Sequence, residues 1–166
     1  MTSPIMKYYK NGKIFQAILP DRTGNIYYPN GGLAFLLSNS GEYRNFIAFD
    51  HDSKNPSQIA SFDSNGNGFC NYPNGKLRYQ INYIGGINFD QSGNCIKKWL
   101  FPEDPDGQSF HPIRFIINEY MSIQIHSRSR IIFIFRSKYG TCRFLIKLKN
   151  LVSFLKFLFQ DKTKKF

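Results

Sequence analysis

The feature that most constrains this chain is a turn that occurs twice. The tetrapeptide Tyr-Pro-Asn-Gly stands at residues 28–31 and again at 72–75, and each copy is followed by alternating polar and apolar residues. Proline fixes φ near −65° at the first corner of a turn, and Asn-Gly accepts left-handed geometry at the next. The pattern predicts that the chain reverses here between paired strands. The residues expected to build these structural turns are Pro29, Asn30, Gly31, Pro73, Asn74 and Gly75.

The two turns belong to a longer repeat. The offset from Tyr28 to Tyr72 is 72 − 28 = 44 residues, and apolar positions downstream of each turn fall on one another at that offset. A third unit at 9–18 has Lys10 in place of proline, and a weaker fourth unit spans 89–99. Four strand–turn–strand units over residues 7–100 predict an antiparallel meander of hairpins.

The second half of the chain has a different sequence pattern. An acidic, Pro-rich connector at 102–109 precedes a second group of apolar segments at 112–148. In this group the run 130–135 is apolar in both alternating sets, which indicates a strand buried on both sides. Either Ile132 and Ile134, or Ile131 with Phe133 and Phe135, face the inner layer.

These patterns predict a mainly β fold, an antiparallel hairpin array in one or two twisted sheets, with a single β domain over residues 1–148. Residues 149–166 carry apolar side chains at helical spacing, which predicts a short amphipathic C-terminal helix with a basic tail. The positions that share this helical face are Leu151, Phe154, Leu155 and Leu158.

Charge is concentrated in the last third of the chain. Residues 1–110 hold 10 Lys/Arg and 9 Asp/Glu, a net of +1, whereas residues 111–166 hold 12 Lys/Arg and 2 Asp/Glu, a net of +10. Such asymmetry favours a surface that binds an acidic partner, although a solvated basic tail is the plainer interpretation. The candidate partner-binding residues are Arg128, Arg130, Arg136, Lys138, Arg143, Lys147 and Lys149.

Patterns of catalysis and metal binding are weak throughout. The three cysteines lack CxxC spacing, and none of the three histidines has a ligand-like neighbour in sequence, so we expect no disulfide framework, metal or cofactor. The segment 63–68 resembles half of a calcium loop but lacks the required glutamate at the twelfth position. Residues 1–13 show no secretory leader and no window is long and apolar enough to span a bilayer. We therefore expect a non-enzymatic protein of a reduced intracellular compartment.

The order of these segments resembles the conserved domain of the glutamate-rich protein six family. The similarity covers roughly residues 24–147 and rests on "GNIYYPNGGLAF", "FDSNGNGFCNYPNGKLRY" and "GGINFDQSGNCIKKWLF", taken in that order. The turns are also similar to membrane occupation and recognition nexus repeats, which are stacked β-hairpins. The sequence departs from the glutamate-rich pattern because it has no acidic low-complexity region and carries a single tryptophan, Trp99.

The resemblance implies a non-enzymatic structural protein of the cytoplasm and of the axoneme of cilia and flagella. Such a protein is expected to dock onto microtubule-associated or radial-spoke subunits. Tubulin is one of the acidic partners that the resemblance implies. A basic RNA-binding or organellar ribosomal protein is the alternative, because cations interleave with Phe133, Phe135 and Tyr139, and a basic sheet with exposed aromatics can stack bases. A membrane-surface module that uses the C-terminal helix is a third hypothesis.

Overall fold

The computed structural model describes residues 3–40, 43–51, 56–102 and 110–146. The described chain is built from β-strands joined by turns. In chain order the strands are β1 (Ile5–Tyr8), β2 (Ile14–Ile18), β3 (Gly24–Tyr27), β4 (Leu33–Ser40), β5 (Tyr43–Phe49), β6 (Gln58–Asp63), β7 (Gly68–Asn71), β8 (Leu77–Ile81), β9 (Gly85–Phe89), β10 (Cys95–Leu100), β11 (Ile113–Ile116), β12 (Met121–Ser127), β13 (Arg130–Ser137) and β14 (Gly140–Ile146).

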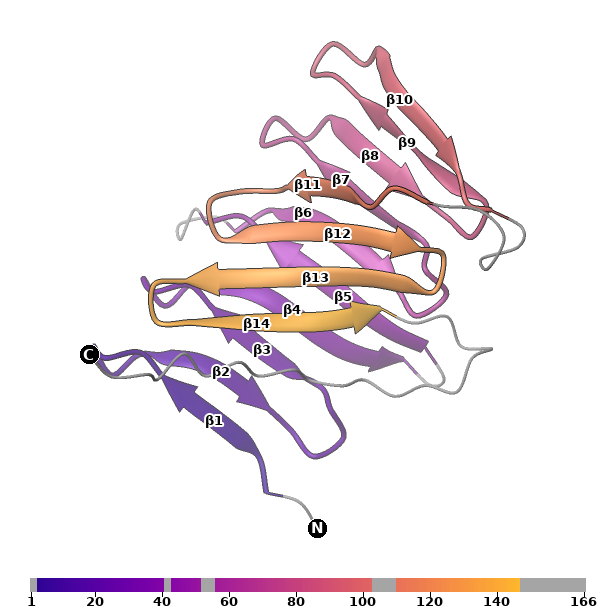
Figure 1. Cartoon of the computed structure of the whole chain (residues 1–166). Helices are drawn as coiled ribbons and strands as arrows, with labels where there is room; N and C mark the ends of the chain where they lie inside the picture. The colour runs from indigo at the N-terminus through magenta and orange to yellow at the C-terminus, as the bar shows by residue number, and fades with distance from the viewer. Residues whose placement is uncertain (1–2, 41–42, 52–55, 103–109, 147–166) are drawn as a thin grey trace, which may run out of the picture.

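The strands form two antiparallel meanders, so the prediction of a mainly β, antiparallel hairpin array is confirmed, and the choice left open between one and two sheets is settled as two. One sheet is 10-stranded and runs from β1 to β10 in sequence order, and the other is 4-stranded and runs from β11 to β14. The small sheet lies across the middle of the large one, and the hairpin β9–β10 extends beyond it (Figure 1). The predicted C-terminal helix falls on residues 149–166, which lie outside the described residues.

The large sheet contains five hairpins, one more than the sequence repeat predicts. The additional hairpin is β5–β6, whose connection at residues 50–57 replaces the Tyr-Pro-Asn-Gly turn with a longer segment. The pairing register shifts at the same place in every hairpin, close to the turn. Such a β-bulge sets two consecutive residues toward the core, as it does for Phe15 and Gln16 and for Ala34 and Phe35, all of them buried.

The hydrophobic core lies between the two sheets and draws on both. Phe35 of the large sheet is fully buried and stacks on Phe133 and Phe144 of the small sheet, with ring centroids 4.6 and 4.8 Å apart. Toward β10, Tyr79 stacks on Phe115 at 4.4 Å. Sheets that stack face to face over interdigitating side chains in this way form a β-sandwich.

The small sheet settles which set of β13 side chains faces inward. Phe133 and Phe135 are fully buried and contact aromatic rings of the large sheet. Ile132 and Ile134 therefore point to the outer face, where Ile134 is still only 5% exposed. The expectation that this strand is buried on both sides holds at Ile134, whereas Ile132 on the same outer side is only partly buried. Within the described residues, no helix is long and apolar enough to cross a membrane.

Candidate interaction surfaces

The two Tyr-Pro-Asn-Gly turns have the same hydrogen-bonded geometry. In the first, the N–H of Gly31 donates to the carbonyl of Tyr28 at 2.8 Å, and the N–H of Tyr28 donates to the carbonyl of Gly32 at 2.8 Å. Gly31 has φ +92°, and Gly75 at the matching position has φ +80°. This is a three-residue hairpin loop that ends in a left-handed glycine, so the predicted structural turns are confirmed.

The asparagine side chain of each turn accepts a backbone hydrogen bond. Asn30 does not adopt positive φ; the left-handed position belongs to the glycine alone. Instead, Asn30 Oδ1 accepts the N–H of Gly32 at 2.9 Å, and Asn74 Oδ1 accepts the N–H of Lys76 at 3.1 Å. The asparagines thus cap the returning strand, and the left-handed geometry expected at Asn-Gly is adopted by the glycine.

The tyrosines that open these turns connect neighbouring hairpins. The hydroxyl of Tyr9 donates to the carbonyl of Tyr27 at 2.6 Å, that of Tyr28 to the carbonyl of Phe49 at 2.7 Å, and that of Tyr72 to the carbonyl of Phe89 at 2.8 Å. Each bond joins one hairpin to the next along the sheet. The repeated tyrosine therefore joins each hairpin to the next through a hydrogen bond, which is a structural role.

Tyr28 also lies where the two sheets meet. Its ring packs edge-on against His51 and Tyr120, at centroid distances of 4.9 and 5.2 Å, and its hydroxyl accepts from Asn118 Nδ2 at 3.0 Å. Burial raises the pKa of the Tyr28 phenol above its ordinary value. A neutral, hydrogen-bonded phenol in an aromatic cluster stabilises the contact between the sheets, and His51 is part of that packing.

The structure distributes the predicted basic residues over three places. Arg128 and Arg130 lie at the turn between β12 and β13, and Arg136 and Lys138 lie at the other end of β13. The six residue steps from Arg130 to Arg136 correspond to about 20 Å along a strand. Arg143 lies on β14 opposite Ile134. The two remaining residues of the prediction, Lys147 and Lys149, lie outside the described residues.

Four arginines share the outer face of the small sheet, which we call the arginine face. Pairing and alternation place Arg130, Arg136 and Arg143 on the side opposite the buried aromatic rings, and Arg114 of β11 lies on this side too. Strands β11–β14 contain no Asp or Glu. The sequence analysis missed Arg114 because it lies outside the dense basic run, and only strand pairing brings it onto this face.

The aromatic residues interleaved with these cations are not equivalent. Phe133 and Phe135 are fully buried in the core, whereas Tyr139 is 38% exposed. The ammonium of Lys138 lies 4.8 Å from the centre of the Tyr139 ring, and that ring meets Tyr9 edge-on at 5.3 Å. The arginine face therefore offers cations without the exposed row of aromatic rings that base stacking requires.

Residues singled out for other chemistry have structural surroundings. The carboxylate of Asp63 accepts the N–H groups of Asn65 and Asn67 at 2.9 and 3.0 Å, so the calcium-like segment is a side-chain-capped turn. Cys70 and Cys142 are buried free thiols, and burial raises the pKa of Cys70 to about 11 and that of Cys142 to about 12. Among the described residues, no group of His, Cys, Asp and Glu is arranged to hold a metal ion.

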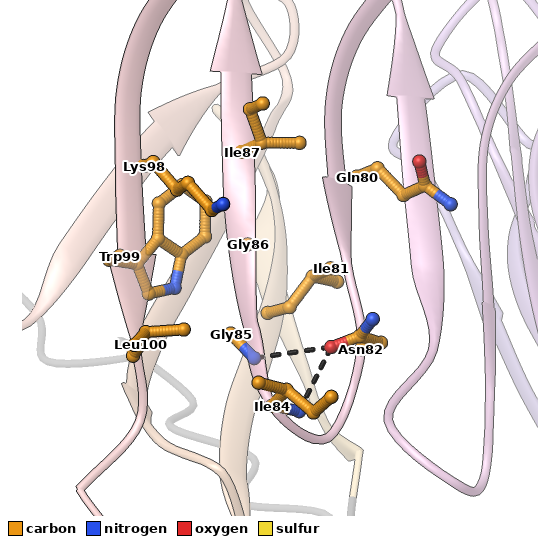
Figure 2. A pocket seen from close by; sticks show the side chains of 10 residues that line it. All are labelled: Gln80, Ile81, Asn82, Ile84, Gly85, Gly86, Ile87, Lys98, Trp99 and Leu100. Atoms are coloured by element: carbon orange, nitrogen blue, oxygen red, sulfur yellow. Dashed lines mark hydrogen bonds between the residues drawn. The ribbon is translucent and has the colours of Figure 1, made fainter.

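A shallow hollow of about 310 Å³ lies beside the glycine pair at the start of β9 (Figure 2). Neither Gly85 nor Gly86 has room for a Cβ, because the backbone and the ring of Trp99 pack directly on them. The side-chain oxygen of Asn82 accepts the N–H groups of Ile84 and Gly85 at 2.9 and 3.2 Å, so this amide is committed to the turn. Lys98 is the one charged residue among the ten that line the hollow. The lining therefore contains no pair of acid–base groups and no nucleophile beside a base.

The family profile described as FAM194 protein matches residues 1–165. The match covers nearly the whole chain, so the chain belongs to the FAM194 protein family. No solved structure matches it.

Proposed function

We propose that this FAM194 family member is a non-enzymatic structural protein of the ciliary axoneme that binds an acidic protein surface through its arginine face. The observation that carries the proposal is the composition of that face: four guanidinium groups on a sheet whose strands contain no carboxylate. Arginine suits such a role because its planar fork binds carboxylates in pairs of hydrogen bonds and is weakly hydrated.

The shape of the molecule supports a docking role. A sandwich with a rigid aromatic core holds the strands that carry the four arginines in a fixed arrangement, so little backbone entropy is lost when a partner binds. The ciliary location rests on the resemblance of the hairpin order to the glutamate-rich family. Microtubule-associated and radial-spoke subunits are the partners that this resemblance implies, and acidic tubulin surfaces match the charge.

RNA binding is the second hypothesis, and the same face separates it from the first. Phosphates attract arginines as carboxylates do, but sequence-tolerant binding of single strands also relies on exposed aromatic rings. Phe133 and Phe135 are buried, which favours a protein partner over a single-stranded nucleic acid.

The binding test compares two triple variants of equal charge. Arg114, Arg130 and Arg136 are replaced by Ser on the arginine face, and Lys10, Lys97 and Lys98 are replaced by Ser elsewhere on the surface. Co-sedimentation with purified microtubules is measured from 50 to 200 mM salt. We expect the arginine variant to lose at least tenfold in affinity and the lysine variant to bind like the natural chain. An equal loss in both variants would mean that only net charge matters and would reject the face-specific proposal.

The same two variants are then tested in cells and against RNA. In a ciliated cell, the tagged natural chain should label the axoneme and the arginine variant should label it weakly. Label throughout the cytosol or in mitochondria, absent from cilia, would contradict the proposal. Tighter binding of the natural chain to generic single-stranded RNA than to microtubules, lost in the arginine variant, would favour the RNA hypothesis instead.

A further inference from the structure

The outer face of the large sheet differs from the arginine face, and we call its part over β3–β9 the neutral face. Successive strands there pair side chains that point away from the small sheet, and most of them are apolar and partly exposed. The neutral face consists of Asn25, Tyr27, Leu33, Leu36, Ile47, Phe49, Gln58, Ser61, Phe69, Asn71, Leu77, Gln80, Ile87 and Phe89.

This face is unusual for a surface that meets water. None of these fourteen residues is charged, although the chain has a net charge of +11. Asp63 lies on the same side at the end of β6, opposite Asn45, and its carboxylate accepts N–H groups of its own turn. The small sheet packs on the opposite side of the large sheet, where Phe35, Tyr79 and Trp99 contact its rings. Nine of the fourteen side chains are apolar, and a largely apolar patch of a few hundred Å² often marks an interaction surface.

The charge distribution of the chain indicates that a second copy of it can cover the neutral face. Two copies of a chain with charge +11 repel one another through any surface that carries the cations. If they meet through the neutral face, their arginine faces point outward on opposite sides of a four-sheet stack. With sheets about 10 Å apart, the arginine faces lie about 30 Å from each other, several times the screening length of about 8 Å at physiological salt. The neutral face is thus the surface on which two copies associate with little charge repulsion.

The size of the face is sufficient for a specific pair. Strands spaced about 4.8 Å apart and about five residues long cover roughly 500 Å² over β3–β9, so a pair buries on the order of 1,000 Å². That area meets the lower bound of specific interfaces, which is about 1,000 Å² in total. A neutral surface that meets itself about a twofold axis also needs no complementary charges on a partner.

We propose that the chain forms a symmetric homodimer in which the neutral faces of two copies pack against each other. The dimer presents one arginine face on each side and so binds two acidic surfaces at once. The dimer does not rest on the proposed axonemal function, because the two proposals use opposite faces of the sandwich.

The first test is the mass of the full chain in solution. We expect light scattering after size exclusion to give twice 19.3 kDa at micromolar concentration, with no loss of dimer at high salt. Ile47→Lys combined with Phe69→Lys places cations at the centre of the interface and should weaken the dimer at least 100-fold. Ile116→Lys on the arginine face is the matched control, because Ile116 is also exposed and should leave the dimer intact.

Several outcomes overturn the dimer. A monomer mass for the natural chain up to about 100 μM would do so, and would indicate that residues 149–166 or another protein covers the face. A dimer that survives Ile47→Lys and Phe69→Lys, with a native circular dichroism spectrum, would place the interface elsewhere. If that variant loses its native circular dichroism spectrum, it is unfolded, and the cross-linking test below decides whether the dimer forms through this face.

The second test fixes the geometry without disturbing the fold. Ser61 lies between Ile47 and Phe69 near the centre of the neutral face. In a background where the exposed Cys95 is replaced by Ser, we expect Ser61→Cys to form an intermolecular disulfide under mild oxidation. Gln124→Cys on the arginine face is the control. It should form no intermolecular disulfide and should migrate as a monomer in non-reducing denaturing gel electrophoresis. Equal cross-linking of both positions would reject the proposed interface.

Discussion

The two outer faces of this sandwich are built on the same kind of strand and end with opposite surfaces. The small sheet turns Arg114, Arg130, Arg136 and Arg143 to the outside, whereas the large sheet turns largely apolar side chains and a single carboxylate, Asp63, to the outside over β3–β9. Both sheets direct aromatic and branched residues inward, where packing between the layers leaves little choice.

The difference separates what folding requires from what it leaves open. The inner positions must be apolar for the two sheets to stack at all. The outer positions carry no such requirement, so a row of arginines on one side and a row of apolar residues on the other each need a separate cause. The two proposals would each supply such a cause: an acidic surface for the arginines and a second copy for the neutral face.

The largest expected effect tests whether the inner and outer faces of one sheet differ as described. Phe35→Ala removes a fully buried ring that stacks on Phe133 and Phe144 of the other sheet. We expect the free energy of unfolding to fall by about 3–5 kcal/mol, since both contact and cavity terms are lost. Urea unfolding followed by circular dichroism measures the change.

Phe69→Ala is the matched control, because Phe69 lies on the neutral face of the same sheet and is only partly buried. At concentrations low enough to keep the chain monomeric, we expect a loss of about 1 kcal/mol. An equal cost for the two substitutions under these conditions would show that the neutral face is covered within one chain, and the contrast between the faces would fail.

Alkaline pH provides a test with the cysteines, because two lie on inner faces and one on the surface. Burial raises the pKa of Cys70 to about 11 and of Cys142 to about 12 from an ordinary value of 9.0, so the unfolded chain releases these protons first. The resulting stability is present below pH 9 and is lost as the pH rises toward 11–12. We expect unfolding free energy to fall by about 2–4 kcal/mol between pH 8 and 10.5.

Thiol labelling at pH 8 checks the same distinction by another route. Cys95 is exposed and should react with a disulfide reagent within seconds, while the buried Cys70 and Cys142 should react only as fast as the chain unfolds. Flat stability up to pH 10.5, or three fast thiols, would contradict the burial of the inner cysteines.

A third prediction concerns the contact between the sheets at one end of the strands. Tyr28→Phe removes a hydroxyl that donates to the carbonyl of Phe49 and accepts from Asn118. Because these two partly buried groups then lose this partner, we expect a loss of about 1–3 kcal/mol. Tyr72→Phe is the control: its hydroxyl makes one bond, to Phe89, and should cost about 1 kcal/mol. Equal costs would show that the contact with Asn118 contributes nothing.

The sequence predicts the strands and turns well because their signals are local. Alternation, Asn-Gly turns and a repeat offset identify the meander without any long-range information. The hairpin β5–β6 was not predicted from the repeat, because a longer connection replaces its turn and interrupts the repeat unit. The bulges escaped because a strict period of two places Phe15 and Gln16 on opposite faces, whereas the shifted register buries both.

The surfaces could be predicted only in part. The excess of cations in the last third was visible from composition, but its arrangement depends on strand pairing. Pairing adds Arg114, and it separates Arg130 from Arg136 by the length of a strand. The neutral face gave no signal, because partly exposed Leu, Ile and Phe on a strand look like core residues until both sheets are in place.

The smallest expected effect lies in the turns, which belong to neither face. Arg22 has φ +68° and occupies the position that Gly66 and Gly93 hold in equivalent turns. We expect Arg22→Gly to stabilise the chain by about 0.5 kcal/mol, because relief of left-handed strain exceeds the added entropy of the unfolded chain. Arg22→Ala removes the same charge beside Arg44 but keeps the strain, so the difference between the two variants isolates the backbone effect. Gly93→Ala is the converse: open space surrounds its missing Cβ, so its expected loss of about 1 kcal/mol comes from φ alone. Equal stability of Arg22→Gly and Arg22→Ala in thermal unfolding would show that left-handed strain at this turn is negligible.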